Sequence, residues 1–78
     1  MIIVVVKLPP DREIFVNGDY DEPRARSQED IVLKPGTHKF ETLTQDGSVD
    51  FRQRLVDVPD FTLRLITLDP VVPPEPTV

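Results

Sequence analysis

Apolar and polar residues alternate over most of this sequence, which is the pattern of β-strands that bury one face. The clearest case is the segment 49–58, where apolar and charged side chains fall on opposite sides of an extended chain. Segments of similar character span residues 1–8, 12–16, 29–34, 37–43 and 61–68. No stretch of the sequence shows the spacing of an amphipathic helix. The pattern therefore predicts an all-β protein.

Turn signals separate these segments. Asn17-Gly18 predicts a tight hairpin turn with residues 19–20 as a short return arm, because this turn needs positive φ at both central positions. Pro35-Gly36 predicts a type II turn. Residues 45–48 and residues 59–60 predict two further turns, for which no type is assigned. About seven short strands are typical of a small antiparallel β-sandwich of the immunoglobulin or prealbumin class. The expected core consists of Val4, Ile14, Val16, Ile31, Leu33, Phe40, Phe51, Leu55, Leu63 and Leu65.

The last strand changes phase along its length. Phe61, Leu63 and Leu65 share one face, after which Ile66 and Leu68 continue the apolar pattern on the other. A one-residue change of phase is what a β-bulge produces, so we expect a bulge near Leu65-Ile66. The alternative is that this end of the strand is covered on both faces.

The first strand is apolar on both faces. Residues 2–6 are consecutive isoleucines and valines without alternation. If Val4 faces the core, Ile3 and Val5 form an apolar stripe on the opposite side, and such stripes are sites of pairing. We therefore expect the first strand to help form an oligomer or to bind a protein partner. The alternative is that the polar loop of residues 21–28, which crosses between the sheets, folds over the stripe.

The composition supports the strand prediction and limits the functions to consider. Alanine, the best helix former, occurs once, whereas there are eleven valines and five isoleucines. Cysteine is absent, which excludes a disulfide-stapled scaffold and a cysteine-based zinc site. The net charge of −5 argues against nucleic acid as a partner, because phosphate binding needs clustered lysine and arginine.

The two ends of the chain suggest neither a membrane span nor a leader. The longest apolar run, Met1–Val6, is too short for a transmembrane helix and lacks the preceding positive charge of a signal peptide. We expect no membrane insertion and, if the chain is complete as given, a cytoplasmic protein.

Residues 69–78 are rich in proline, which predicts an extended tail or linker after a domain of residues 1–68.

Few residues could carry chemistry. His38 is the only histidine, and because it shares parity with Phe40 we expect it to be half-buried at a sheet end rather than a ligand or base. Acidic residues around the crossover loop could in principle bind calcium, but their spacing matches no known calcium loop, so we expect a solvated loop. These residues are Asp19, Asp21, Glu22, Glu29 and Asp30. We expect no catalytic residue, no cofactor and no metal site.

Three arginines complete the candidate interaction surface. Arg52 and Arg54, with Arg64, are expected on the outward face of a closing hairpin made by the last two strands. Because they are interleaved with aspartates, they indicate a mixed-charge solvent face that resists edge-to-edge pairing. Contact with a protein or an anionic polysaccharide is the functional alternative. Together with Ile3 and Val5, these arginines form the predicted interaction surface.

Several short motifs follow one another in a characteristic order. They are VKLPP at 6–10, IFVNGDY at 14–20, VLKPGTHKF at 32–40 and the closing hairpin of residues 49–68. This order resembles the PEGA domain family over roughly residues 2–68. Glu22-Pro23-Arg24 stands where that family has a G-x-T-P segment, and the GY pair that follows its fifth strand is missing. The resemblance implies a sandwich fold and a non-catalytic accessory module, often of envelope or surface proteins, with no catalytic residue.

The predicted function is a non-catalytic binding or structural accessory module that contacts a protein or a cell-envelope component. The alternative is a self-associating assembly subunit of the phage or secretion type, which a concentration-dependent mass in solution would favour. An enzyme is not expected. A bound metal, or a buried polar cluster around His38, would revive that possibility.

Overall fold

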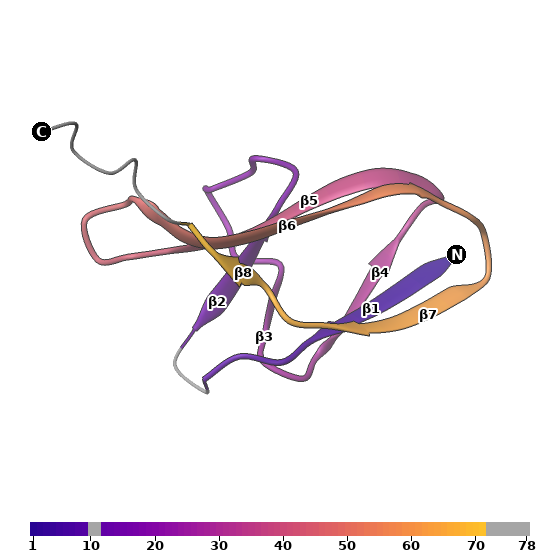
Figure 1. The fold of residues 1–78 in the computed structure, drawn as a ribbon, viewed down its shortest axis with the longest axis horizontal. Coiled ribbons are helices and arrows are strands. Elements are labelled where there is room, and N and C mark those ends of the chain that lie inside the picture. Colours follow the sequence, from indigo (N-terminus) through magenta and orange to yellow (C-terminus); the bar gives the residue numbers. More distant parts are fainter. Residues whose placement is uncertain (10–11, 72–78) are drawn as a thin grey trace, which may run out of the picture.

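The computed structural model describes residues 1–9 and 12–71, which form strands, turns and loops without a helix (Figure 1). The all-β prediction is therefore confirmed. In chain order the strands are β1 (Ile2–Val6), β2 (Glu13–Val16), β3 (Ala25–Arg26), β4 (Asp30–Leu33), β5 (Gly36–Leu43), β6 (Val49–Val58), β7 (Thr62–Ile66) and β8 (Asp69–Pro70). They form two sheets with an apolar core, an arrangement consistent with a small β-sandwich.

The two sheets differ in size. One has the strand order β4-β1-β7, and the other has the order β3-β2-β5-β6-β8. β1 runs parallel to β7, and the other described pairs are antiparallel. The long hairpin of β5 and β6 forms the centre of the larger sheet, and its turn at residues 45–48 is as predicted. The smaller sheet packs against one side of the larger and leaves its own second side as an outer face.

Alternation explains how the core is filled. Ile2, Val4 and Val6 of β1 are buried, whereas the residues between them are half-buried. Phe40 of β5 is completely enclosed, as is Ile14 of β2. Of the predicted core residues, Val4, Ile14, Val16, Ile31, Leu33, Phe40 and Leu55 are buried, Phe51 is partly buried, and Leu63 and Leu65 are exposed. The prediction is therefore correct for most of the core and wrong for β7.

Two connections that were predicted as turns cross between the sheets. The turn at Pro35-Gly36 leads from β4 in the smaller sheet to β5 in the larger, and residues 59–61 lead from β6 back to β7. Gly36 has a φ of 131°, a conformation that only glycine adopts easily. The predicted closing hairpin of the last two strands is therefore wrong, because β6 and β7 pair with other strands.

The segment after the Asn17-Gly18 turn also differs from the prediction. Residues 19–20 form no return arm, and the Asn17 N–H instead donates to the carbonyl of Lys39 in β5 (2.8 Å). Within the expected loop of residues 21–28, β3 adds a short strand to β2. Sequence-distant pairing therefore takes the place of the local hairpin.

β7 keeps a single phase. Leu63 and Leu65 face outward, whereas Ile66 and Leu68 are buried. The register of β7 with β1 is unbroken over the whole of both strands. The bulge expected near Leu65-Ile66 is therefore wrong, and so is the alternative of cover on both faces, because the two leucines belong to the outer face.

The irregularities of register lie in β6 instead. Near its start, two residues of β6 oppose one of β5, which leaves Asp50 as the additional residue. Near its end, three steps along β6 match two along β5, and Asp57 there has a φ of 48°. The Asp57 N–H donates to Oγ1 of Thr37 (3.1 Å). The first of these bulges positions Asp50 for a polar cluster described below.

The predicted tail begins inside the fold. β8 pairs with β6, and the Val71 N–H donates to the carbonyl of Asp50 (2.9 Å). The first residues of the segment 69–78 are therefore part of the larger sheet. The rest of that segment, residues 72–78, lies outside the described residues.

Candidate interaction surface

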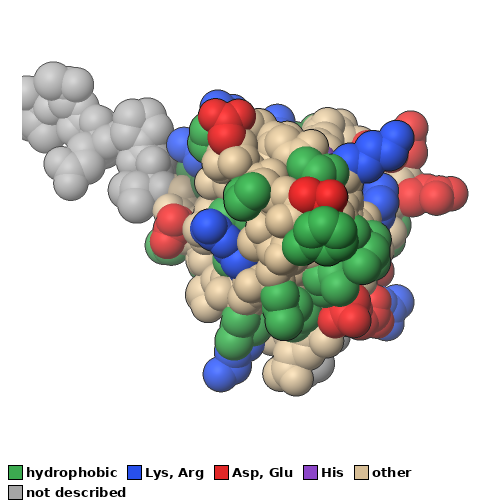
Figure 2. Space-filling view, turned by 90° about the vertical axis from the view of Figure 1, so that its right-hand side faces the viewer, with side chains coloured by type: hydrophobic (Ala, Val, Ile, Leu, Met, Phe, Trp, Pro, Cys, Tyr) green, Lys and Arg blue, Asp and Glu red, His purple; other side chains and the backbone are tan. Residues whose placement is uncertain are grey.

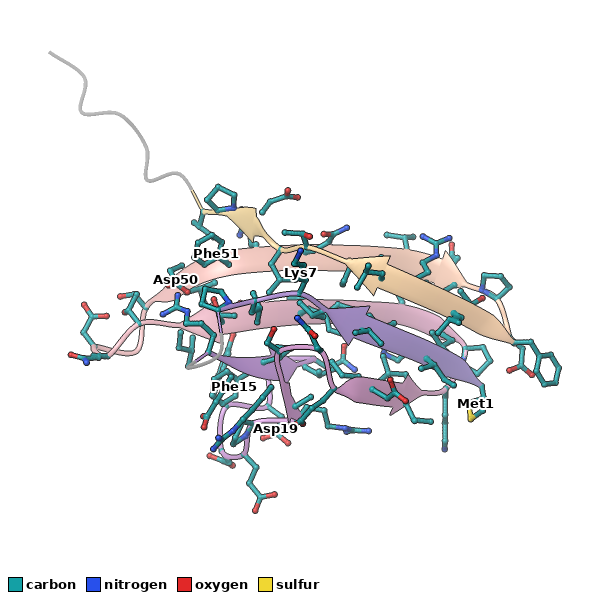
Figure 3. All side chains as sticks on the ribbon, turned by 90° about the horizontal axis from the view of Figure 1, so that it is seen from below. Met1, Lys7, Phe15, Asp19, Asp50 and Phe51 are labelled. Carbon is teal, nitrogen blue, oxygen red and sulfur yellow. The ribbon has the colours of Figure 1, made fainter. Side chains whose placement is uncertain are left out.

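The outer face of the smaller sheet carries apolar side chains that the described part of the chain leaves exposed. Val32 of β4 is 49% exposed, and Leu63 and Leu65 of β7 are 74% and 71% exposed. Ile3 and Val5 of β1 lie between them and are half-buried. We call these five residues the outer apolar face. Figure 3 shows their strands, β4, β1 and β7, side by side.

Two more exposed apolar residues lie directly before β1 and β7 in the chain. Met1 is 53% exposed and Phe61 is 89% exposed. Figure 2 looks at the end of the molecule that carries Met1 and shows hydrophobic side chains gathered there, with acidic and basic ones among them. Phe61 has a φ of 58°, which lies in the left-handed region. This conformation costs a bulky residue about 1–2 kcal/mol. An aromatic ring is thus held in solvent by a strained backbone.

Strand register orders this surface into three rows, because residues directly opposite each other in neighbouring strands share a face. The middle row is apolar throughout. Each flanking row has two apolar residues and one charged residue on the β4 side, and the two charges have opposite sign. The rows are Asp30–Val5–Leu65, Val32–Ile3–Leu63 and, when the same register is continued past the strand ends, Lys34–Met1–Phe61.

The loop of residues 21–28 leaves the outer apolar face open. Its strand β3 pairs with β2 in the larger sheet. Nη2 of Arg24 donates to the carbonyl of Val32 (3.2 Å), so the loop reaches β4, an edge strand of the smaller sheet. The loop therefore closes the side of the molecule, and the alternative in which it covers Ile3 and Val5 is wrong.

β7 forms the other edge of the smaller sheet. Among the described residues it pairs with β1 alone. Arg64 lies in the middle of this edge, opposite the buried Val4, and is exposed. A charged side chain at such a position hinders the addition of another strand. The edge is therefore less suited to pairing than the face beside it.

The two arginines of β6 lie in the other sheet. Arg52 and Arg54 are exposed on β6, whereas Arg64 belongs to the smaller sheet. The three arginines were predicted to share one face, and this prediction is wrong. Arg52 has Glu41 of β5 as its neighbour on one side and Asp69 of β8 on the other. Carboxylates on both sides favour a mixed-charge solvent face over a site for anions.

Glu41 is the centre of a polar cluster on the larger sheet. It is only 5% exposed, accepts a hydrogen bond from the Tyr20 hydroxyl (2.7 Å), and lies 3.5 Å from Nζ of Lys39. The Phe15 ring packs beside Tyr20, with centroids 6.0 Å apart. The hydrogen bond to Glu41 raises the pKa of Tyr20, and partial desolvation and the carboxylate charge raise it further. The cluster fixes the segment after the Asn17-Gly18 turn to the sheet.

A second polar cluster lies at the end of the molecule opposite Met1, where Figure 3 shows Asp50 and Phe51. Arg12 forms an ion pair with Asp50, and its guanidinium lies 5.6 Å from the centroid of the Phe51 ring. Asp50 also accepts a hydrogen bond from the hydroxyl of Thr42, which is 1% exposed. Because each polar group has a partner, this cluster stabilises the fold.

His38 is half-buried, as predicted. Its Nε2–H donates to the carbonyl of Lys34 (2.6 Å), and its Nδ1 accepts from Nδ2 of Asn17 (3.1 Å). The Asn17 amide oxygen accepts the N–H of Lys39 (3.0 Å), which orients its NH2 group towards the histidine. The imidazole therefore ties the end of β4 to the β2–β5 pair.

The expected acidic stretch does not converge within the described residues. Asp19 accepts the backbone N–H of Asp21 (3.2 Å), a local turn contact. No three His, Cys, Asp or Glu side chains of the described ranges gather as the ligands of a metal would. In the same ranges, no helix has the length and hydrophobicity needed to cross a membrane.

No known protein family matches the chain, and neither a curated protein nor a solved structure matches it. The PEGA-like order of turns has no support from relatives and stays a prediction. The sequence pattern identified Ile3 and Val5 of the outer apolar face but not Leu63 and Leu65. Leu63 and Leu65 are odd-numbered positions of the strand, and Ile66 and Leu68 are even-numbered. This difference places the two pairs on opposite faces and is the signal that could have identified the exposed leucines.

Proposed function

We propose that this protein is a non-catalytic binding or structural module that contacts a protein partner through the outer apolar face. The observation that supports this proposal most directly is the exposure of Leu63 and Leu65, each above 70%, beside the half-buried Ile3 and Val5. Contiguous apolar side chains on a sheet surface are costly to leave in water and are typical of protein interfaces. The role belongs to binding rather than folding, because the core is filled by other residues.

Further support comes from the polar residues. The two best-connected polar clusters, around Glu41 and around Asp50, are engaged in contacts that hold strands and loops together. Both ring nitrogens of His38 form hydrogen bonds of this kind. These side chains therefore have structural tasks, and an apolar surface is the feature left to account for function.

The fold class belongs to the same proposal. Two sheets with a mostly antiparallel topology support a sandwich of the immunoglobulin or prealbumin class. The turns at Asn17-Gly18 and Pro35-Gly36 support the likeness to PEGA domains and, with it, an accessory role in an envelope or surface assembly.

Site-specific photo-crosslinking tests the proposed surface. A photoreactive phenylalanine analogue replaces Leu65 in one variant, and in the control it replaces Val56, an equally apolar residue that is 64% exposed on the larger sheet. In an extract of the source cells, position 65 should give an adduct of discrete mass that Leu63→Lys abolishes. Equal labelling at both positions, or none at position 65, would contradict the proposal.

A further inference from the structure

The partner of the outer apolar face can be specified from its pattern of residues. We infer that it is a second copy of this chain, packed face to face about a two-fold axis that lies across the strands, over the middle row Val32–Ile3–Leu63. This inference rests on the proposed function, because it uses the same surface and adds the identity of the occupant. Homo-oligomers with two-fold symmetry are the commonest assemblies of soluble proteins.

The axis follows from the rows defined above. A two-fold rotation about the middle row turns the second sheet over and reverses its strand direction, while each strand stays above its own counterpart. The apolar middle row then meets itself, so that Leu63 of one copy packs on Leu63 of the other. Each flanking row meets the opposite flanking row of the second copy. The surface is therefore complementary to itself.

The apolar residues of the flanking rows match under this operation. Val5 lies over Met1 of the second copy, and Leu65 lies over Phe61 of the second copy. This contact accounts for the unusual state of Phe61, which is 89% exposed on a backbone with a φ of 58°. In the dimer its ring would be covered by a leucine that is itself 71% exposed in the single chain.

The charges match as well. Asp30 and Lys34 lie two residues to either side of Val32, so the same axis places Asp30 over Lys34 of the second copy, and the reverse. Two ion pairs result at the β4 side of the interface, and the two-fold axis relates one pair to the other. The other face-to-face two-fold has its axis along the strands and would place β4 over β7 of the second copy. Asp30 and Lys34 would then face Leu65 and Phe61 without a charged partner, which costs affinity. The charges therefore select the antiparallel, two-fold arrangement.

Edge-to-edge pairing of two copies through β7 is the competing geometry. It would bring Arg64 of the two copies close together at the centre of the new pair when the strands are in full register. Like charges in such a position are destabilising, and edge strands use them to prevent association. The charge of Arg64 therefore favours association through the outer apolar face over association through the edge.

Charge reversal tests the arrangement without removing apolar contacts. Asp30→Lys gives a chain with two lysines at these positions, and Lys34→Asp gives a chain with two aspartates. In sedimentation equilibrium, the wild type should show reversible dimerisation, and each variant alone should dimerise more weakly by about tenfold or more. An equimolar mixture of the two variants should recover a one-to-one heterodimer, and the double variant Asp30→Lys/Lys34→Asp should recover the wild-type constant.

Two further measurements keep the outcomes separate. Circular dichroism of each variant reports folding, which we expect to be unchanged because both positions are exposed. Leu63→Ser removes both leucines of the contact on the axis and should weaken association even if a charge variant fails to fold. The inference is overturned if the wild type stays monomeric at all concentrations, or if the mixture gains nothing over its components.

The crosslinking experiment at position 65 distinguishes failure of the inference from failure of the proposed function. An adduct of twice the mass of the chain supports the second copy. An adduct of any other protein leaves the proposed function standing and overturns the inference. The absence of any adduct at position 65 overturns both.

Discussion

Leu65 and Ile66 are consecutive residues of β7, yet Leu65 is 71% exposed and Ile66 is 8% exposed. Successive side chains of a strand point to opposite faces, so β7 presents the leucine to solvent and the isoleucine to the core. Apolar side chains stabilise a fold only to the extent that folding removes them from water. The two residues therefore have different tasks, one in folding and one on the outer apolar face.

Alanine substitutions should separate these tasks. Ile66→Ala should lower the free energy of unfolding by about 2–5 kcal/mol, because it leaves a cavity in the core. Leu65→Ala, measured at a concentration where the chain is monomeric, should change it by less than about 0.5 kcal/mol. Urea unfolding followed by circular dichroism measures both. Equal losses would contradict the assignment of the two faces.

The cluster around Asp50 should contribute measurably to stability. Asp50→Ala removes the ionic partner of Arg12 and leaves the buried hydroxyl of Thr42 without its acceptor. A buried polar group left without a partner costs about 1–3 kcal/mol, and we expect a loss of that size in denaturant unfolding.

A double-mutant cycle supplies the control for Asp50. Thr42→Val removes the hydroxyl itself, so the pair Asp50→Ala/Thr42→Val no longer contains an unsatisfied buried group. The combined loss should therefore be smaller than the sum of the two single losses. Strict additivity would show that the hydrogen bond between the two side chains contributes nothing.

How far sequence predicts this fold can be seen at particular residues. Alternation in the segment 49–58 and the apolar run of β1 predicted both strands, because side-chain period follows directly from extended backbone. Alternation does not say which of two apolar faces is inside. At β7, Leu63 and Leu65 were assigned to the core, whereas the structure buries Ile66 and Leu68 and leaves the two earlier leucines exposed.

Strand partners were the second limit. The pairing of β1 with β7 joins residues about sixty positions apart in the chain, and no local signal records it. The same limit applies to the outer apolar face. Ile3 and Val5 were identified from their own strand, whereas Val32 and the two leucines joined them only through the register of neighbouring strands.

Tyr20 should titrate above its ordinary pKa of 10.0, because its hydroxyl donates to Glu41. The raised pKa means that the neutral phenol is favoured in the folded chain. This contribution to stability is fully present below the pKa of the unfolded chain and is lost as the pH rises through the folded pKa. Tyr20 is the only tyrosine and tryptophan is absent, so the ultraviolet absorbance of tyrosinate reports on this residue alone.

Glu41→Gln is the matched variant for this titration. It removes the carboxylate charge and weakens the hydrogen bond, so the pKa of Tyr20 should fall towards 10.0. Circular dichroism over the same pH range verifies that both proteins remain folded. An unchanged midpoint in the variant would show that Glu41 is not the cause of the shift.

Phe61 should show a conflict between stability and association. Its φ of 58° is unfavourable for a bulky residue, and its ring is 89% exposed in the single chain, so little within the described residues compensates for the strain. Asparagine tolerates this conformation better. Phe61→Asn should therefore raise the free energy of unfolding of the monomer by about 0.5–1 kcal/mol, while it weakens dimerisation by removing the contact with Leu65 of the second copy.

The matched control is Leu63→Asn, which removes a similar apolar surface from extended backbone and should weaken dimerisation without the gain in stability. Urea unfolding at low concentration and sedimentation at high concentration measure the two effects. If Phe61→Asn stabilises the chain and leaves association intact, the exposed ring has no part in the interface.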